Sequence, residues 1–259
     1  MSSLANTQRN FAFVGPTYER VKDRTLIPRA GFEVMPPVRR GDIRALLNYE
    51  PGVIVIIDGR FHQSLAVGHA ELRLAIEAGW VLWGLSSMGA IRAFEMRTMG
   101  MRGFGEVYQH FLAEGDFQDD EVALLHAADP PFVALSEPLI HIRHFLAELE
   151  TSQGIDRQVA QQIVDDLKAK WFGERNLPAL VSLISRYCGP DVANVARSYI
   201  REFDRFRVKT RDLVAFFEGA YWRADPPPPR PTPAPYTVRP GPVFPTDDNT
   251  MRPAPGVGP

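Results

Sequence analysis

Short apolar runs alternate with helix-forming segments through the first half of the chain. The clearest run, residues 53–57, is β-branched and continuously apolar, and it ends at Asp58-Gly59. Similar runs cover residues 11–14, 32–35 and 81–85. Continuously apolar runs are typical of strands buried on both faces of a parallel sheet, and strands that alternate with helices form open α/β sheets. The pattern therefore predicts an α/β fold with a parallel-type sheet in the N-terminal half.

Apolar positions spaced three and four apart predict helices between and after these strands. In the first half, helices are expected at residues 42–49, at 66–78 and from about residue 87. After about Glu137 the pattern is helical throughout. The helices expected there cover residues 137–149, 156–169, 178–187, 191–208 and 210–221. The sequence thus predicts a helical C-terminal part that follows the sheet.

The composition changes abruptly at Asp225, where a proline-rich tail begins. More than half of the 23 prolines lie in residues 226–259. Proline removes backbone donors and favours extended geometry, so this tail is predicted to be disordered; its PxxP-type spacing is also that of peptide ligands. The expected division is an α/β core at residues 1–136, a helical region at 137–224 and a disordered tail at 225–259.

Composition and charge exclude several classes of protein. The net charge is −2 and the basic residues are scattered, so no patch for nucleic acid is expected. No apolar run approaches the roughly 20 residues needed to cross a bilayer, and the N-terminal segment lacks the apolar region of a secretory signal. Cys188 is the single cysteine, which excludes an intramolecular disulfide and a thiolate metal cluster. We expect a cytoplasmic protein that binds neither nucleic acid nor membrane.

Three loops that follow strands carry small or polar residues. They read Gly15-Pro16-Thr17, Asp58-Gly59-Arg60-Phe61 and Ser86-Ser87-Met88-Gly89. In a parallel α/β sheet, ligands bind beyond the carboxyl ends of the strands. We therefore expect these three loops to converge on one site.

Ser87 is the leading candidate for chemistry because it lies where a strand turns sharply into a helix. Gly84 and Gly89 flank it in a pattern that resembles the nucleophile elbow of α/β hydrolases, although the strict G-x-S-x-G spacing is not met. Free backbone amides at the helix start, from Met88 and Gly89, are expected to hold an oxyanion. The alternative is that Ser86 or Ser87 only caps the helix, because serine is common at N-caps.

Other polar residues have both a chemical and a structural interpretation. Asp58 could orient a base, bind a ligand or cap the next turn. Arg92 and Glu95 are three apart on one helix, so they either pair with each other or anchor a carboxylate. His69 shares a helix face with apolar residues such as Leu72, as expected of a histidine satisfied in the core.

The sequence predicts neither a metal nor a cofactor. The acidic string at 119–121 fits a solvated turn better than a metal site, and His141 and His144 share a helix face without a third ligand. The glycine string at 100–105 has the wrong order for a dinucleotide fingerprint, and no strand is expected before it.

These loops, read in order along the chain, resemble the TfuA-like family. The resemblance extends from about residue 11 to 145. The motifs that carry it are Val14-Gly15-Pro16-Thr17, Pro36-Pro37 with Arg40-Gly41-Asp42, Ile57-Asp58-Gly59-x-Phe61, His69-x-Glu71, Gly84-x-Ser86-Ser87-Met88-Gly89-Ala90-x-Arg92-Ala93-x-Glu95, Gly100-Met101-x-Gly103-x-Gly105 with Tyr108, Asp119-Asp120-Glu121-Val122-Ala123, and Ser136-Glu137.

The resemblance implies a role in peptide-backbone thioamidation. TfuA-like proteins accompany YcaO enzymes, which use ATP to activate a peptide amide so that sulfur can replace its oxygen. The resemblance implies that this protein hydrolyses the thiocarboxylated C-terminus of a ubiquitin-like sulfur carrier, ThiS. Sulfide is thereby released for YcaO. The expected partners are a YcaO-type enzyme, a ThiS-like carrier and, through YcaO, the precursor or target peptide.

The serine–lysine pair of the family carries over only in part. Ser87 matches the serine, within Ser-Met-Gly. Where the family usually reads His-Lys-Glu, this chain has Ala70 in place of the lysine. Alanine cannot take a proton, and a serine hydroxyl needs a neighbouring base to become a useful nucleophile. His69 is the nearest candidate in the sequence for a substitute base, and Lys22 is a second candidate.

Two interpretations follow from the resemblance, and a third from the fold alone. In the first, Ser87 attacks the thiocarboxylate as an enzyme nucleophile. In the second, the protein is a non-catalytic module that binds YcaO and the carrier, an interpretation that Ala70 favours. The third is an unrelated α/β serine hydrolase, but no histidine follows His144 to complete the usual Ser-Asp-His order.

Overall fold

The structure is a computed structural model that describes residues 9–60, 65–115 and 118–223. The predicted disordered tail at 225–259 lies outside the described residues, and so does Phe61. In the part of the chain that is described, no helix combines the length and the apolar composition needed to cross a membrane.

A five-stranded parallel sheet forms the N-terminal half and confirms the predicted α/β fold. Its strand order is β2-β1-β3-β4-β5. The strands are β1 (Asn10–Phe13), β2 (Phe32–Met35), β3 (Val53–Ile56), β4 (Val81–Leu85) and β5 (Arg102–Phe104). The first four coincide with the apolar runs. The fifth was not expected, because its three residues include Arg102 and Gly103, which give no β-strand pattern.

Alternate residues of the central strands pack on opposite faces of the sheet. Phe11, Phe13 and Ile54 belong to the core cluster on one face, which includes residues of α3 (Asp42–Leu46), α4 (His69–Glu77) and α5 (Met88–Met96). Ala12 and Val55 belong to the cluster on the other face, with α2 (Leu26–Arg29) and α11 (Val208–Glu218). Both faces are covered by helices, which is why the strands read as unbroken apolar runs.

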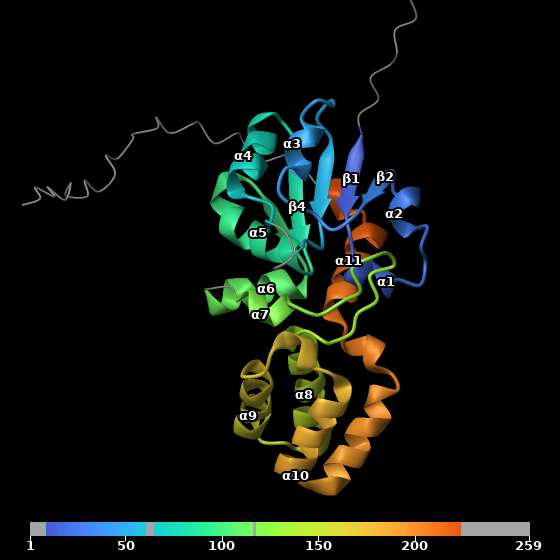
Figure 1. Ribbon diagram of the computed structural model, residues 1–259, viewed down its shortest axis with the longest axis vertical. Helices are drawn as coiled ribbons and strands as arrows, with labels where there is room; N and C mark the ends of the chain where they lie inside the picture. The colour runs from blue at the N-terminus through green and yellow to red at the C-terminus, as the bar shows by residue number, and fades with distance from the viewer. Residues whose placement is uncertain (1–8, 61–64, 116–117, 224–259) are drawn as a thin grey trace, which may run out of the picture.

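The helical C-terminal part has its own core. Its main elements are α8 (Leu139–Gln153), α9 (Arg157–Lys168) and α10 (Leu177–Ile200), and they lie below the sheet in Figure 1. The two helices expected at 178–187 and 191–208 are the two halves of α10. They meet at a kink where Gly189 has a φ of 87° and Pro190 follows it, and the second half ends at Ile200, earlier than expected. Three further helices lie earlier in the chain. Helix α1 (Pro16–Glu19) follows β1, and α6 (Glu106–Glu114) and α7 (Asp119–Val122) lie between β5 and α8.

Helix α11 returns from the helical part to the sheet (Figure 1). Its Leu213, Phe216 and Phe217 are buried against residues of β1, β3 and β4. This return places the first turn of α11 close to the loops that follow the strands. The division of the chain into domains stays a prediction, but the last helix contributes to the core of the α/β layer.

Two glycines allow α5 to lie unusually close to the sheet. A Cβ on Gly89 would lie 1.7 Å from the Ile56 carbonyl oxygen, and a Cβ on Gly84 would lie 2.0 Å from the Gly89 carbonyl oxygen. The Gly89 amide donates a hydrogen bond to the Ile57 carbonyl at 3.2 Å. Close approach of two backbones requires residues without a side chain, so these glycines fix where the β4–α5 turn lies.

We expect Gly89→Ala to lower the free energy of unfolding by more than about 3 kcal/mol, because the new methyl group would meet backbone that cannot move aside. The matched control is Gly68→Ala at the start of α4, where nothing lies within 4 Å of an added Cβ. Gly68 is the N-cap of α4, where alanine is less favoured than glycine, so the control is expected to cost no more than about 1 kcal/mol. Urea unfolding of both variants measures the difference, and equal stabilities would contradict the close approach.

Candidate functional site

The loops after β1 and β3 meet at the side chain of Asp58. Its carboxylate accepts hydrogen bonds from the Gly15 amide at 2.8 Å, the Thr17 amide at 3.0 Å and the Thr17 hydroxyl at 2.7 Å. Asp58 and Thr17 are both buried. The amides of the Gly15-Pro16-Thr17 loop are therefore engaged by Asp58, which holds the loop in place beside the sheet.

The turn from β4 into α5 is strained at Ser86, and Ser87 follows it. Ser86 has a φ of 65°, which is uncommon for a residue other than glycine. Its hydroxyl donates to the Lys209 carbonyl at 2.8 Å, and this hydrogen bond connects the turn to the start of α11. Ser87 occupies the N-cap position of α5, yet its side chain makes no capping hydrogen bond. The Ser86 hydroxyl is therefore engaged by the Lys209 carbonyl, whereas the Ser87 hydroxyl is not used to cap α5.

Ser87 lines a cavity of about 590 Å³ at this end of the sheet. Pro16, Asp58 and Lys209 also line it, as do Leu125 and Trp171. The wall opposite the strand ends comes from the segment around α7 and from the loop before α10. The cavity therefore brings together the three strand-end loops with residues that lie far away in the sequence.

Lys209 is a residue of this cavity that the sequence did not predict. It lies in the first turn of α11, is 2% exposed, and donates to the Val122 carbonyl at 3.1 Å. Burial lowers the pKa of its ammonium group, and the carboxylates of Asp58 and Glu137 oppose that change only in part. The available signal was weak: Lys209 is one of only four lysines, but its position depends on the return of α11 to the sheet.

His69 and Ala70 line a different cavity from Ser87. That cavity has a volume of about 720 Å³ and is also lined by Arg92. The side chain of His69 is 54% exposed, and its Nε2 lies 2.8 Å from Glu95 Oε2. The expectation of a core histidine is therefore wrong, because α4 begins at His69 and turns Leu72, not His69, into the core.

Arg92 and Glu95 pair with each other, as one of the two sequence interpretations predicts. Arg92 Nε also donates to the Val67 carbonyl at 2.9 Å. Because Glu95 accepts from both Arg92 and His69, this group forms a polar cluster at the start of α4. The cluster lies apart from the residues that line the cavity of Ser87.

The Met88 and Gly89 amides differ in their availability. The Gly89 amide already donates to Ile57, as described above, so it has no free hydrogen for an oxyanion. The Met88 amide, at the first position of α5, is the remaining backbone candidate.

Glu137, His141 and Arg207 form a buried ionic network near Lys209. Glu137 Oε2 lies 2.9 Å from His141 Nδ1, and Arg207 Nε donates to Glu137 Oε1 at 3.2 Å. Although burial raises the pKa of Glu137, hydrogen bonds from His141 and Arg207 outweigh it and lower the value to about 2. Burial lowers the pKa of His141 to about 4, against the opposing effect of Glu137. At neutral pH the pair is a carboxylate and a neutral imidazole.

Two residues of the acidic string at 119–121 form ion pairs, which a solvated turn would not require. Glu121 accepts two hydrogen bonds of 2.9 Å from Arg143, and Asp120 pairs with the buried guanidinium of Arg175. His144 lies 3.9 Å from Glu106 and does not join His141 in a common cluster. Within the described ranges, no group of three or more His, Cys, Asp or Glu side chains could hold a metal ion.

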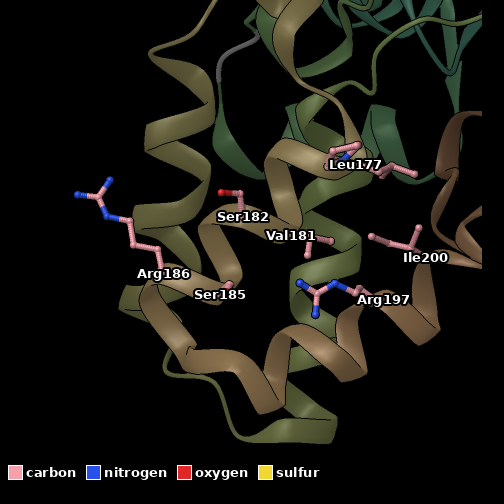
Figure 2. A pocket seen from close by; sticks show the side chains of 8 residues that line it. Leu177, Val181, Ser182, Ser185, Arg186, Arg197 and Ile200 are labelled. Atoms are coloured by element: carbon pink, nitrogen blue, oxygen red, sulfur yellow. The ribbon is translucent and has the colours of Figure 1, made fainter.

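A further cavity of about 690 Å³ lies within the helical part and holds none of these groups. It is lined by residues before and after the kink of α10, including Val181, Ser182 and Arg197. Figure 2 shows Arg197 reaching into the space between the two halves of α10, while Arg186 points away from it. No carboxylate or histidine lines this cavity.

Comparison with known proteins gives a match to a protein family. Residues 58–176 match the model of the family described as TfuA-like protein. No curated protein matches the chain. The matched segment includes Asp58, Ser87, Glu137 and His141 but ends before Lys209.

Acidification is expected to destabilise the fold in two steps. His141 has an ordinary pKa of 6.5 and a folded pKa of about 4, so its contribution is complete above pH 6.5 and is lost as the pH falls toward 4. Glu137, with an ordinary value of 4.5 and a folded value of about 2, adds a loss between pH 4.5 and 2.

Urea unfolding as a function of pH measures both steps. In His141→Gln the step between pH 6.5 and 4 is expected to shrink, because glutamine does not titrate. Burial raises the pKa of Asp212 to about 7, which adds stability as the pH falls over the same range. The test is therefore the difference between the two proteins, and an identical pH dependence of wild type and His141→Gln would contradict the burial of a neutral histidine.

Proposed function

Since this chain belongs to the TfuA-like family, we propose that it supplies sulfide for YcaO-dependent peptide thioamidation. It hydrolyses the thiocarboxylated C-terminus of a ThiS-like carrier and helps to recruit the peptide. Members of the family are generally associated with YcaO systems. The observation that carries the proposal is that Ser87, whose hydroxyl makes no capping bond, and the buried Lys209 line one cavity.

Lys209 acts as the base for Ser87. An amine can take a proton only in its neutral form, and burial favours that form for Lys209. The family resemblance would place the lysine at position 70, but Ala70 lines another cavity. Lys209 therefore supplies, from a distant part of the chain, the group that position 70 lacks.

The reaction has two steps. Ser87 Oγ attacks the carbonyl carbon of the thiocarboxylate, its proton passes to Lys209, and the Met88 amide donates to the developing oxyanion. The carbon–sulfur bond breaks, and sulfur leaves as hydrosulfide with the proton from Lys209. Water, deprotonated by Lys209, then attacks the ester on Ser87. The bond between Ser87 Oγ and the carbonyl carbon breaks, Lys209 returns its proton to Ser87 Oγ, and the acid product leaves as the carboxylate after losing its proton to solvent.

The cavity suits the end of a flexible tail. Its volume of about 590 Å³ lies in the range of ordinary small-molecule sites. Pro16 and Leu125 give it apolar walls, while Ser87, Asp58 and Lys209 supply the polar groups. A folded carrier would remain outside and insert only its C-terminal residues.

A second function, that of a binding module without chemistry, rests on one observation. The family's lysine is replaced by Ala70. In this case the protein would dock YcaO and the carrier, and the cavity of Ser87 would only hold the tail. The activity of the Ser87 and Lys209 variants separates the two functions.

We expect Ser87→Ala and Lys209→Met to lower the rate of thiocarboxylate hydrolysis by at least about 100-fold each, because each removes one partner of the proton transfer. The measurement is mass spectrometry of a thiocarboxylated ubiquitin-like carrier, together with sulfide release. The matched control is Lys22→Met, an exposed lysine outside the cavity, which is expected to keep the wild-type rate.

The variant Ala70→Lys tests the position of the base. Since residue 70 lines another cavity, this lysine is expected to add no activity. Hydrolysis that appears only in Ala70→Lys would refute Lys209 as the base. A wild-type protein that binds the carrier and leaves the thiocarboxylate intact would favour the binding module.

A further inference from the structure

His141 has a buried nitrogen without a partner next to Lys209. The histidine is 4% exposed, and its Nδ1 contacts Glu137. Its Nε2 finds no hydrogen-bond partner among the residues that the structure describes. An unpaired polar atom at such a depth is costly and calls for an explanation, for which ordered water is a common one.

The contact with Glu137 fixes the proton on the other nitrogen. An ionised carboxylate only accepts hydrogen bonds, so Nδ1 carries the proton and Nε2 keeps its lone pair. Arg207 holds the second oxygen of the Glu137 carboxylate. The imidazole therefore presents an acceptor, in a fixed direction, on the side away from Glu137.

A cavity of about 20 Å³ is lined by both His141 and Lys209. About 10–15 Å³ is enough for one water molecule, provided that it has at least two polar partners. Here the partners are an acceptor, His141 Nε2, and a donor, the amine of Lys209. The size and the chemistry both fit a single water.

We propose that one water bridges His141 Nε2 and Lys209 Nζ, and that Glu137 and His141 are positioning residues that direct Lys209 toward Ser87. This inference rests on the proposed hydrolase function of that site. A neutral amine has two N–H groups and one lone pair. One N–H donates to the Val122 carbonyl at 3.1 Å, and the other donates to the water. The lone pair is then left for the hydroxyl of Ser87.

The bridge orients Lys209 without taking its proton. The buried imidazole stays neutral, because burial lowers the pKa of His141 to about 4, and the proton that Lys209 takes from Ser87 remains for the leaving sulfur. The other charged groups around Lys209 are Asp58 after β3, Arg207 before α11, and Arg20 after α1.

The bridge is tested without reference to activity by NMR of the full chain. Because the chain has six histidines, selective ¹⁵N-histidine labelling gives few signals. The expected result is an Nδ1–H tautomer for His141 with a hydrogen-bonded Nε2 at neutral pH. In Lys209→Met, Nε2 is expected to lose that hydrogen bond, and the pKa of His141 to rise by at least about 0.5 unit. An Nε2–H tautomer, or a His141 signal unchanged by Lys209→Met, would overturn the inference.

Kinetics then test what the bridge does. We expect His141→Gln to lower kcat by about tenfold with little change in KM and to alter the pH profile, because the base is misdirected while the binding surface remains. His144→Gln, on the same helix and outside the small cavity, is the control and is expected to keep the wild-type profile.

The two proposals can fail separately. A wild-type protein without hydrolysis, but with a hydrogen-bonded Nε2 that responds to Lys209→Met, would refute the function and support the bridge. Hydrolysis that needs Lys209 but is unaffected by His141→Gln would refute the positioning role. If His141→Gln does not fold, the NMR comparison of wild type and Lys209→Met decides the matter alone.

Discussion

The site depends on the contact between the β4–α5 turn and the start of α11. The hydroxyl of Ser86 donates to the carbonyl of Lys209, and the apolar side of α11 packs against the sheet. These interactions bring Lys209 to the cavity that Ser87 lines, although the two are more than a hundred residues apart in the chain. The positive φ of Ser86 also shapes the site. With this backbone conformation the Ser86 hydroxyl meets α11, while Ser87 lines the cavity.

Burial of charge is the second constraint on this region. Lys209, Glu137 and His141 are all removed from water, and each charged or polar group is costly there unless it has a partner. Asp58 is fully hydrogen-bonded to the first loop, and Glu137 is held by Arg207 and His141. The arrangement keeps the lysine close to carboxylates without a direct salt bridge among the described contacts, so its amine remains suited to accept a proton.

Most of the fold could be predicted from the sequence, because strands buried on both faces leave unbroken apolar runs. The convergence of the loops at Asp58 and Ser87 also followed from the rule that sites lie beyond the strand ends. The strand β5 could not be predicted, since three residues with an arginine and a glycine carry no period.

Lys209, the proposed base, could not be predicted for a different reason. Lys209 reaches the site only through the long-range packing of α11, and no local pattern reports which helix will cover a sheet. The family resemblance places the lysine at position 70, but that residue of α4 lines another cavity. His141 was considered as a metal ligand, whereas its partner is the carboxylate of Glu137 one helical turn away.

A double-mutant cycle tests whether Ser87 and Lys209 work as one catalytic unit. Residues that act together in one proton transfer give losses that do not multiply. We expect Ser87→Ala, Lys209→Met and the double variant all to hydrolyse the thiocarboxylated carrier at the same residual rate. A double variant whose loss equals the product of the two single losses would show that the two residues act independently.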